Sequence, residues 1–301
     1  MPDVALPASP RRLPAIGPLL AAQIRYQVRL LLANGRTVAV GIAIPLIFLV
    51  ATGRHPSASD VARDAVFGLT LTAWNANGVR LVAARQAGVL KRWRATPLPR
   101  WCYLAGRITA TVLVAVVSGA VTVTVAALFY HLHLTVSATL GVLAVFVLGA
   151  AAWAAAATAL TAAIPTVEAA TPIFTLIYFP LIIISGALGS ISEPHWLSIL
   201  ASYLPAQPLI AGATHALHHL HGTPLLPTRD IVVLAAWAGA GIAIAVLSFR
   251  WEPQRATQRR AARTTARPEP NETGRCALDP ATPPKTAPRN DQPSRPQSSI
   301  G

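Results

Sequence analysis

The chain has few acidic residues and almost no lysine. Eleven Asp and Glu stand against 25 Lys and Arg in 301 residues, and the only lysines are Lys91 and Lys285. Neither follows the glycine of a G-x-x-x-x-G-K-[ST] loop, whose backbone and lysine hold a triphosphate. The sequence therefore excludes a nucleotide site of this kind. We expect this chain to bind no cofactor or metal of its own, so that any ATP and magnesium would be used on a partner.

Cysteine is equally scarce. Cys102 and Cys276 both lie in strongly basic stretches and do not form the evenly spaced set of a disulfide framework or a zinc site. The N-terminus also lacks the charged, apolar and small-residue order of a cleavable signal peptide. We therefore expect the first hydrophobic segment to target the chain.

Hydrophobic residues are abundant and clustered. They make up 53% of the chain, only 12% is charged, and the mean hydropathy is +0.49. A helix needs about 20 apolar residues to cross a bilayer, and lipid offers backbone groups no partner outside a helix. We predict an all-α integral membrane protein with six transmembrane helices. Their expected ranges are 37–52, 65–83, 108–130, 138–164, 169–189 and 231–249.

Residues 1–36 are expected to form a cytoplasmic leader that contains an amphipathic helix. Apolar residues at helical spacing share one face of this segment, whereas Arg25 and Arg29 lie elsewhere. We expect the helix to lie at the membrane interface; the alternative is an ordinary soluble helix packed on another domain. The apolar face consists of Leu19, Leu20, Ile24, Val28, Leu31 and Leu32.

Residues 37–250 are assigned to the transmembrane domain and residues 251–301 to a tail. The tail is rich in Pro, Arg, Thr, Gln and Ser and has few large apolar residues. Such a composition buries too little surface to offset the entropy of ordering. We predict a disordered, basic cytoplasmic tail.

The distribution of basic residues predicts the orientation in the membrane. Lysine and arginine accumulate on the cytoplasmic side, and here they crowd the leader, the tail and the segment 84–107. The opposite side has only Arg54, Arg63 and Arg229, and two of these stand next to Asp64 or Asp230. Both termini are therefore expected in the cytoplasm of a bacterium, at its plasma membrane. This topology explains the net charge of +14 without a nucleic-acid partner.

The most specific motif lies in the basic segment between the second and third spans. It reads RQAGVLKRWRATPLP from Arg85 to Pro99. This segment resembles the signature of the ABC-2 permease family, in the branch of daunorubicin-resistance and nodulation exporters. Gln86 and Ala87 occupy positions at which members of that family commonly have glutamate. The residues that match are Gly88, Leu90, Arg92, Arg94, Thr96, Pro97 and Leu98. The resemblance implies that these residues, together with Lys91 and Trp93, couple the chain to an ATPase.

A second likeness follows the fifth span. Apolar residues recur at helical spacing after Pro194, which predicts a short amphipathic helix in the outer leaflet, similar to the outer re-entrant helices of the same family. We expect this region to form an outer gate. Its residues are Ser185, Gly186, Pro194, Trp196, Leu197, Leu204 and Pro205.

The resemblance implies a permease that dimerises with itself or with a second permease, and that recruits an ABC ATPase. The implied activity is export of a hydrophobic or amphipathic substrate such as a drug, a lipid or a glycan. The segment between Gly88 and Leu98 would form a coupling helix, because a rigid element with proline at its exit transmits movement from the ATPase. The alternative is that its arginines only set the topology.

Polar residues inside lipid are functional candidates by default. Asn75 and Asn77 lie in the second span and are candidates for the transport path or for helix packing. We expect the path between the first, second and fifth spans. Small residues that permit close helix approach are Gly141, Gly149, Gly239 and Gly241.

Two other classes of function remain open. An intramembrane hydrolase could use Ser185 as its nucleophile, but no histidine lies within any expected span to act as its base. An ion-coupled transporter would be expected to carry carboxylates in its spans, and the expected ranges have none in mid-membrane. His215, His218, His219 and His221 imitate a metal site but have no carboxylate or cysteine near them in the sequence.

Overall fold

The computed structural model describes residues 16–33, 35–53, 55–89, 100–131, 134–188, 194–218 and 227–248. The chain divides into two units, Met1–Gln258 and Arg259–Gly301. The predicted tail, 251–301, lies outside the described residues, as do the first 15 residues of the leader. The described residues all belong to the first unit.

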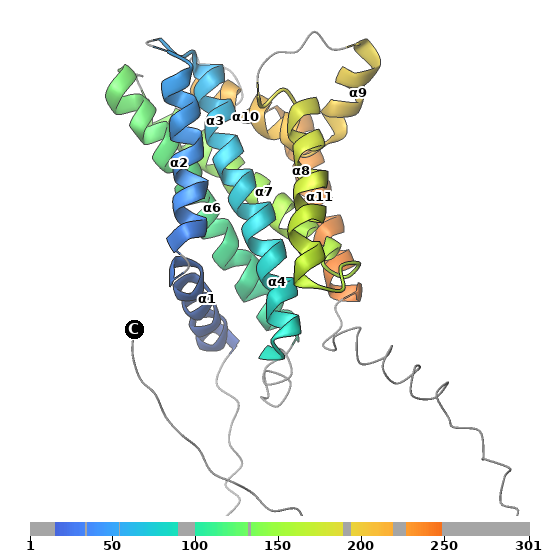
Figure 1. Cartoon of the computed structure of the whole chain (residues 1–301). Coiled ribbons are helices and arrows are strands. Elements are labelled where there is room, and N and C mark those ends of the chain that lie inside the picture. The colour runs from blue at the N-terminus through green and yellow to red at the C-terminus, as the bar shows by residue number, and fades with distance from the viewer. Residues whose placement is uncertain are drawn as a thin grey trace, which may run out of the picture. The chain divides into compact units, whose positions relative to one another are not determined.

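The first unit is a bundle of helices, and no strand occurs in the described ranges (Figure 1). One end of the bundle holds α1 and the end of α4, and we name it the α1 end. The other holds the α2–α3 turn, the end of α8 and α9, and we name it the α9 end. The helices are α1 (Ile16–Ala33), α2 (Gly35–Ala51), α3 (Ala58–Leu71), the π-helix η1 (Thr72–Ala76), α4 (Asn77–Gln86), α6 (Arg100–Tyr130), α7 (Val136–Leu160), α8 (Val167–Ile184), α9 (His195–Tyr203), α10 (Ala206–Leu217) and α11 (Thr228–Ser248).

Four helices among the described residues are long and apolar enough to cross a membrane. They span Trp101–Tyr130, Val136–Leu160, Val167–Ile184 and Thr228–Leu247. The pair α1 and α2, bent by 63°, could add a fifth span. By itself α2 has 17 residues, and the second predicted span is divided among α3, η1 and α4. Length and composition therefore identify four or five spans where six were predicted.

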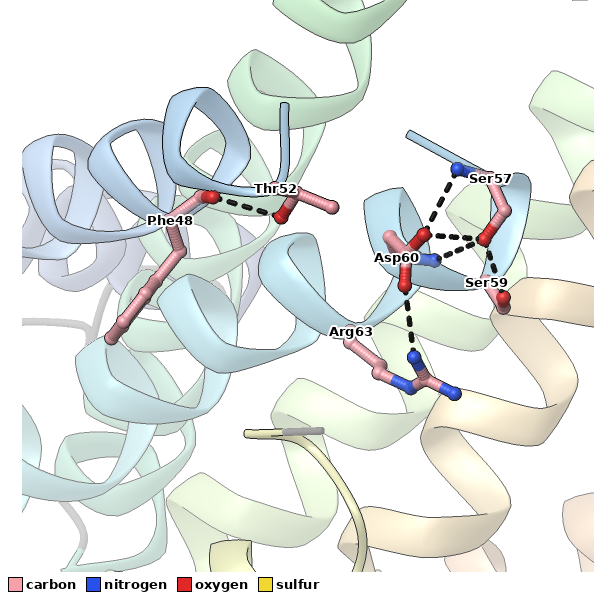
Figure 2. Close-up of polar contacts among 6 residues, drawn as sticks. All are labelled: Phe48, Thr52, Ser57, Ser59, Asp60 and Arg63. Carbon is pink, nitrogen blue, oxygen red and sulfur yellow. Dashed lines mark hydrogen bonds and ion pairs between the residues drawn. The ribbon is translucent and has the colours of Figure 1, made fainter. Parts of the chain in front are cut away.

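The α3, η1 and α4 segments follow one another without a break from Ala58 to Gln86, and we call this continuous element the α3–α4 rod. It begins seven residues before the predicted span 65–83. The cause is a capping box: the Ser57 hydroxyl accepts from the Asp60 amide at 3.2 Å, and the Ser57 amide donates to the Asp60 carboxylate at 3.0 Å (Figure 2). Hydropathy alone placed the start too late, because capping residues are polar.

The core is centred on α7, which contacts α6, α10, α11 and the α3–α4 rod. It contains a cluster of aromatic rings from three elements. Trp153 of α7 lies edge-to-face against Trp74 of η1 at 5.4 Å and against Tyr178 of α8 at 5.8 Å. The indole Nε1 of Trp74 donates to the Phe174 carbonyl at 2.9 Å. These contacts fix the rod against α7 and α8.

Helix α1 packs on α6 with a face that includes two glutamines. The buried residues are Gln23, Gln27 and Leu31, whereas Leu32 is 55% exposed. The glutamine face fits because α6 presents Gly106 to it: a Cβ there would lie 2.6 Å from the Cγ of Gln23. The predicted helix is confirmed, and its position at the membrane interface stays a prediction, with Leu32 of the apolar face exposed.

Three of the four small residues that were predicted to permit close approach are buried. Gly141 and Gly149 belong to the buried side of α7. A Cβ at Gly241 would lie 2.8 Å from the backbone of Ala155, so α11 and α7 touch there. Gly239 is different, because it is exposed and no atom lies within 4 Å of its would-be Cβ.

We expect Gly241→Ala to destabilise the bundle, since the added methyl meets backbone that cannot move aside. The expected loss in free energy of unfolding is about 1 to 3 kcal/mol, as for other overpacked sites. Thermal unfolding of the purified protein in detergent measures it. Gly239→Ala is the matched control on the same helix and should leave the midpoint unchanged or slightly raised. Equal midpoints for both variants would contradict the close α7–α11 contact.

Candidate functional site

The predicted coupling segment is described only at its start. Gly88 follows α4 with a φ of +67°, a left-handed conformation that glycine adopts at no steric cost. This explains the need for glycine where the rod ends. The remaining residues of the predicted segment lie outside the described part of the chain. They are Leu90, Lys91, Arg92, Trp93, Arg94, Thr96, Pro97 and Leu98.

The end of α4, just before this segment, is tied to the turn between α7 and α8. The Arg85 guanidinium donates to the carbonyls of Thr161 at 2.5 Å and Ile164 at 2.6 Å. The side-chain oxygen of Gln86 accepts from the amide of Val167, the first residue of α8, at 3.1 Å. Arg85 therefore belongs to α4, not to a basic loop. A movement at Gly88 would be transmitted to α7 and α8 as well as to the rod.

Asn77 is fully buried and joins three helices. Its amide nitrogen donates to the Ala154 carbonyl at 3.0 Å and to the Thr158 hydroxyl at 2.9 Å, both on α7. Arg107 of α6 donates from Nε to the Asn77 Oδ1 at 3.0 Å and from Nη2 to its carbonyl at 2.9 Å. The sequence placed Arg107 in a cytoplasmic loop; the structure corrects this, since its side chain is only 5% exposed, inside α6. Of the two functions considered for Asn77, these contacts support helix packing.

Asn75 faces a different environment, although it lies only two residues away. The π-helical turn of η1 buries Trp74 and Asn77 and leaves Asn75 half-buried at the wall of a groove. Single π turns of this kind occur frequently at functional sites. The structure thus separates the two asparagines, and only Asn75 lines open space.

The groove has a volume of about 440 Å³ and lies between α2, the α3–α4 rod and α8. Its polar contributors include Thr72 and Asn75 from the rod and Thr171 and Thr175 from α8. Arg80 lies toward the α1 end, where its Nη2 donates to the Leu30 carbonyl of α1 at 2.6 Å. The groove is therefore mostly apolar, with a few hydroxyl and amide groups and the Arg80 side chain, which suits an amphipathic ligand.

The predicted outer-gate residues gather at the α9 end. Ser185 caps α8 and donates its hydroxyl to the Leu181 carbonyl at 2.6 Å. Gly186 follows with a φ of +71°. Pro194 and Leu204 flank α9, and Pro205 precedes α10.

Helix α9 exposes an aromatic and aliphatic face. Trp196 is 65% exposed, Tyr203 is 60% exposed, and Leu197 is half-buried. Two residues of α11 contact this helix. The Trp237 indole donates to the Tyr203 carbonyl at 2.8 Å, and the Arg229 guanidinium lies 5.6 Å from the centre of the Tyr203 ring. An anchored helix with exposed Trp and Tyr is typical of a membrane interface.

The histidine cluster is only partly described. His215 lies on α10 and His218 follows it, whereas His219 and His221 lie outside the described residues. The sequence suggested that no carboxylate accompanies these histidines. In the structure Asp230, at the start of α11, interacts electrostatically with His215. No group of three or more metal-ligating side chains occurs in the part of the chain that was searched.

We expect Asn77→Ala to destabilise the protein, because it leaves the buried Arg107 guanidinium without its side-chain acceptor. Breaking a buried charged contact costs about 3 to 5 kcal/mol in soluble proteins and hydrogen bonds in membranes are worth less, so we expect about 2 to 3 kcal/mol. Denaturant titration in mixed micelles measures it. Asn75→Ala is the control and should change stability by less than about 0.5 kcal/mol. Similar losses in both variants would contradict the separation of the two asparagines.

Residues 21–217 match the family described as ABC-2 type transporter. The match covers more than half of the chain, from α1 through α10, and includes the groove, the segment after Gly88 and the α8–α10 region. Among curated proteins, none matches the chain. The chain belongs to the ABC-2 type transporter family, as the permease component of an ABC transporter.

Proposed function

We propose that this permease exports a hydrophobic or amphipathic substrate, such as a drug, a lipid or a glycan, from a bacterial cell. ABC-2 permeases work in general with an ABC ATPase; here we propose that a separate ATPase subunit supplies the energy. We also assign the chain to the daunorubicin-resistance and nodulation branch. The observation that carries the proposal is a family match over residues 21–217 that contains a groove able to accept an amphipathic ligand.

The proposed topology has six crossings. They are α2, the α3–α4 rod, α6, α7, α8 and α11, which run side by side in alternating directions (Figure 1). The end of α4 and the helix α1 lie at the same end of the bundle, and the basic segment directly follows α4 in the sequence. Positive charge is retained in the cytoplasm, so we assign the α1 end to the cytoplasm and the α9 end to the outside. The helix α1 would then lie at the inner interface.

We place the transport path along the groove between α2, the α3–α4 rod and α8. Large apolar side chains near it are exposed in the single chain, including Val40 and Ile47 of α2 and Leu176 of α8. A second permease, identical or related, would cover this face and complete the path. The small polar contribution of Asn75 and Thr175 would suit substrates with a few hydrogen-bonding groups.

The proposed coupling element is the segment from Gly88 to Leu98. It is supported by the contacts of Arg85 and Gln86, which connect its base to the α7–α8 turn. An ATPase that pushes on this segment would therefore move α8, one wall of the groove. The region from Ser185 to Pro205 would form the gate at the other end of the same helix.

The two alternative functions fare differently. Ser185 donates its hydroxyl to a carbonyl in its own helix, whereas a nucleophile needs a base as acceptor, so a hydrolase is disfavoured. One observation supports an ion-coupled transporter. The α3–α4 rod begins at Ala58 and therefore includes the buried carboxylate of Asp64. A requirement for ATP distinguishes the exporter from such a transporter.

We expect the triple variant Arg92→Gln, Arg94→Gln and Leu98→Ala to lose substrate-stimulated ATP hydrolysis and export by tenfold or more. The reason is that the variant removes the charged and apolar contacts with the ATPase. The measurement uses the permease copurified with its ATPase in proteoliposomes. The control variant Arg25→Gln with Arg29→Gln removes two charges from exposed positions on α1 and should retain both activities.

Undiminished export by the triple variant would show that the coupling assignment is wrong. Transport by the chain alone, driven by an ion gradient in the absence of an ATPase, would overturn the exporter proposal itself.

A further inference from the structure

A second hollow lies at the α9 end, apart from the groove. Its volume is about 310 Å³, at the lower limit of small-molecule sites. The end of α2, the first turns of α3 and the turn after α8 form its walls. Three charged residues line it, namely Asp60, Arg63 and Asp64.

Two of the three charges in this cavity satisfy each other. The Arg63 guanidinium donates to the Asp60 Oδ1 at 2.9 Å, and both side chains are more than a quarter exposed. The other oxygen of Asp60 accepts from the Ser57 amide at 3.0 Å and from its hydroxyl at 2.6 Å (Figure 2). Asp60 therefore has a complete set of partners, and Arg63 is already engaged. The neighbour of Asp64 in the sequence is not its ion-pair partner.

Asp64 is the charge that remains. Asp64 is 8% exposed, and its side-chain Oδ2 atom is buried without a hydrogen-bond partner among the described residues. Burial without a partner disfavours the ionised form of a carboxyl group, and a bound cation would restore it. The helix start does not require it, because Asp60 already supplies the capping box. The carboxylate is therefore placed for a cation that the chain does not itself provide there.

The rest of the cavity indicates what kind of cation fits. Phe48, Ala51, Ala187 and Leu188 contribute apolar surface, which favours an organic cation with an apolar body over a hydrated metal ion. A single carboxylate matches a single ammonium group, and an aromatic ring in the lining adds a favourable surface for it. An anionic ligand would lack a free cation, since Arg63 is paired with Asp60.

We propose that this cavity binds the protonated amine of an amphipathic cation, with the Asp64 carboxylate as its counter-ion. This inference rests on the proposed function and names a class of substrate for it. Ala187 and Leu188 directly follow the proposed gate residues Ser185 and Gly186, so an exported amine would meet the cavity at the gate. Such an amine could belong to a transported amphiphile or to the headgroup of phosphatidylethanolamine in the outer leaflet.

The test measures binding of dansylcadaverine, a fluorescent amphipathic amine, and of its neutral N-acetyl derivative. The full-length chain is reconstituted in nanodiscs of phosphatidylglycerol, which contain no amine lipid. We expect Asp64→Asn to weaken binding of the amine by tenfold or more and to leave binding of the N-acetyl derivative unchanged, because only the amine is charged. Equal affinity of the wild type and Asp64→Asn for the amine would overturn the proposal, as would equal losses for both probes.

A second variant should act in the opposite direction. Arg63→Gln releases the Asp60 carboxylate from its ion pair and makes the cavity more negative. In alkaline buffer, where Asp64 is ionised with or without Arg63 beside it, we expect this variant to tighten amine binding by about two- to fivefold, the size of a partly exposed charge contribution. A purely structural function of Asp64 predicts no such gain, and its absence would count against the counter-ion. Glu168→Gln, which removes a carboxylate from the first turn of α8, is the control for general membrane electrostatics and should have no effect.

Nanodiscs that include phosphatidylethanolamine distinguish the two sources of the amine. Displacement of dansylcadaverine from the wild type by this lipid identifies the headgroup as a ligand; undiminished binding identifies a soluble amphiphile. The assay needs no ATPase. If amine binding depends on Asp64 but no ATP-driven export occurs, the proposed function is refuted and the amine site is retained. If export occurs but amine binding does not depend on Asp64, the amine site is refuted and the proposed function is retained.

Discussion

The bundle depends on one constraint: a polar group that is shielded from water must find its partner inside the protein. Lipid supplies no hydrogen bonds, so many of the described polar side chains in the core bond to backbone carbonyls and to one another. Asn77 joins the α3–α4 rod to α6 and α7 in this way, and Tyr178 joins α8 to α3 through the hydroxyl of Thr70 at 2.9 Å. These bonds decide which faces of the helices meet, because apolar surfaces in lipid pack with little directional preference.

The same constraint divides polar residues into two groups. Asn77, Arg85 and Arg107 are satisfied by neighbouring helices and hold the architecture. Asn75 lines a groove, and Asp64 lines a cavity and keeps an oxygen without a partner among the described residues. A polar residue in a membrane helix is therefore informative about ligands only when its hydrogen bonds within the protein have been traced.

Sequence reasoning located helices well where hydropathy defines them and less well where other forces do. The ranges predicted for α7, α8 and α11 agree with the structure to within about five residues at each end. The start of α3 was missed because it is set by the Ser57 capping box. Arg107 was misplaced because a charged residue looks like a loop residue until its partner, Asn77, is known. The two asparagines could not be separated, since a π turn breaks the regular spacing on which such an assignment relies. The coupling residues from Leu90 to Leu98 stay a prediction.

The π-helical turn at Thr72–Ala76 gives the α3–α4 rod a property that a uniform helix lacks. It holds one residue more than an α turn, so the two halves of the rod are out of step by one position, or about 100° of rotation. The direction of Asp64, in the half toward α9, is therefore rotated relative to the direction that a uniform helix would give it when Asn77 faces α7. Substitutions in the half that carries Asp64 can therefore accumulate without disturbing the contacts by which Asn77 anchors the other half.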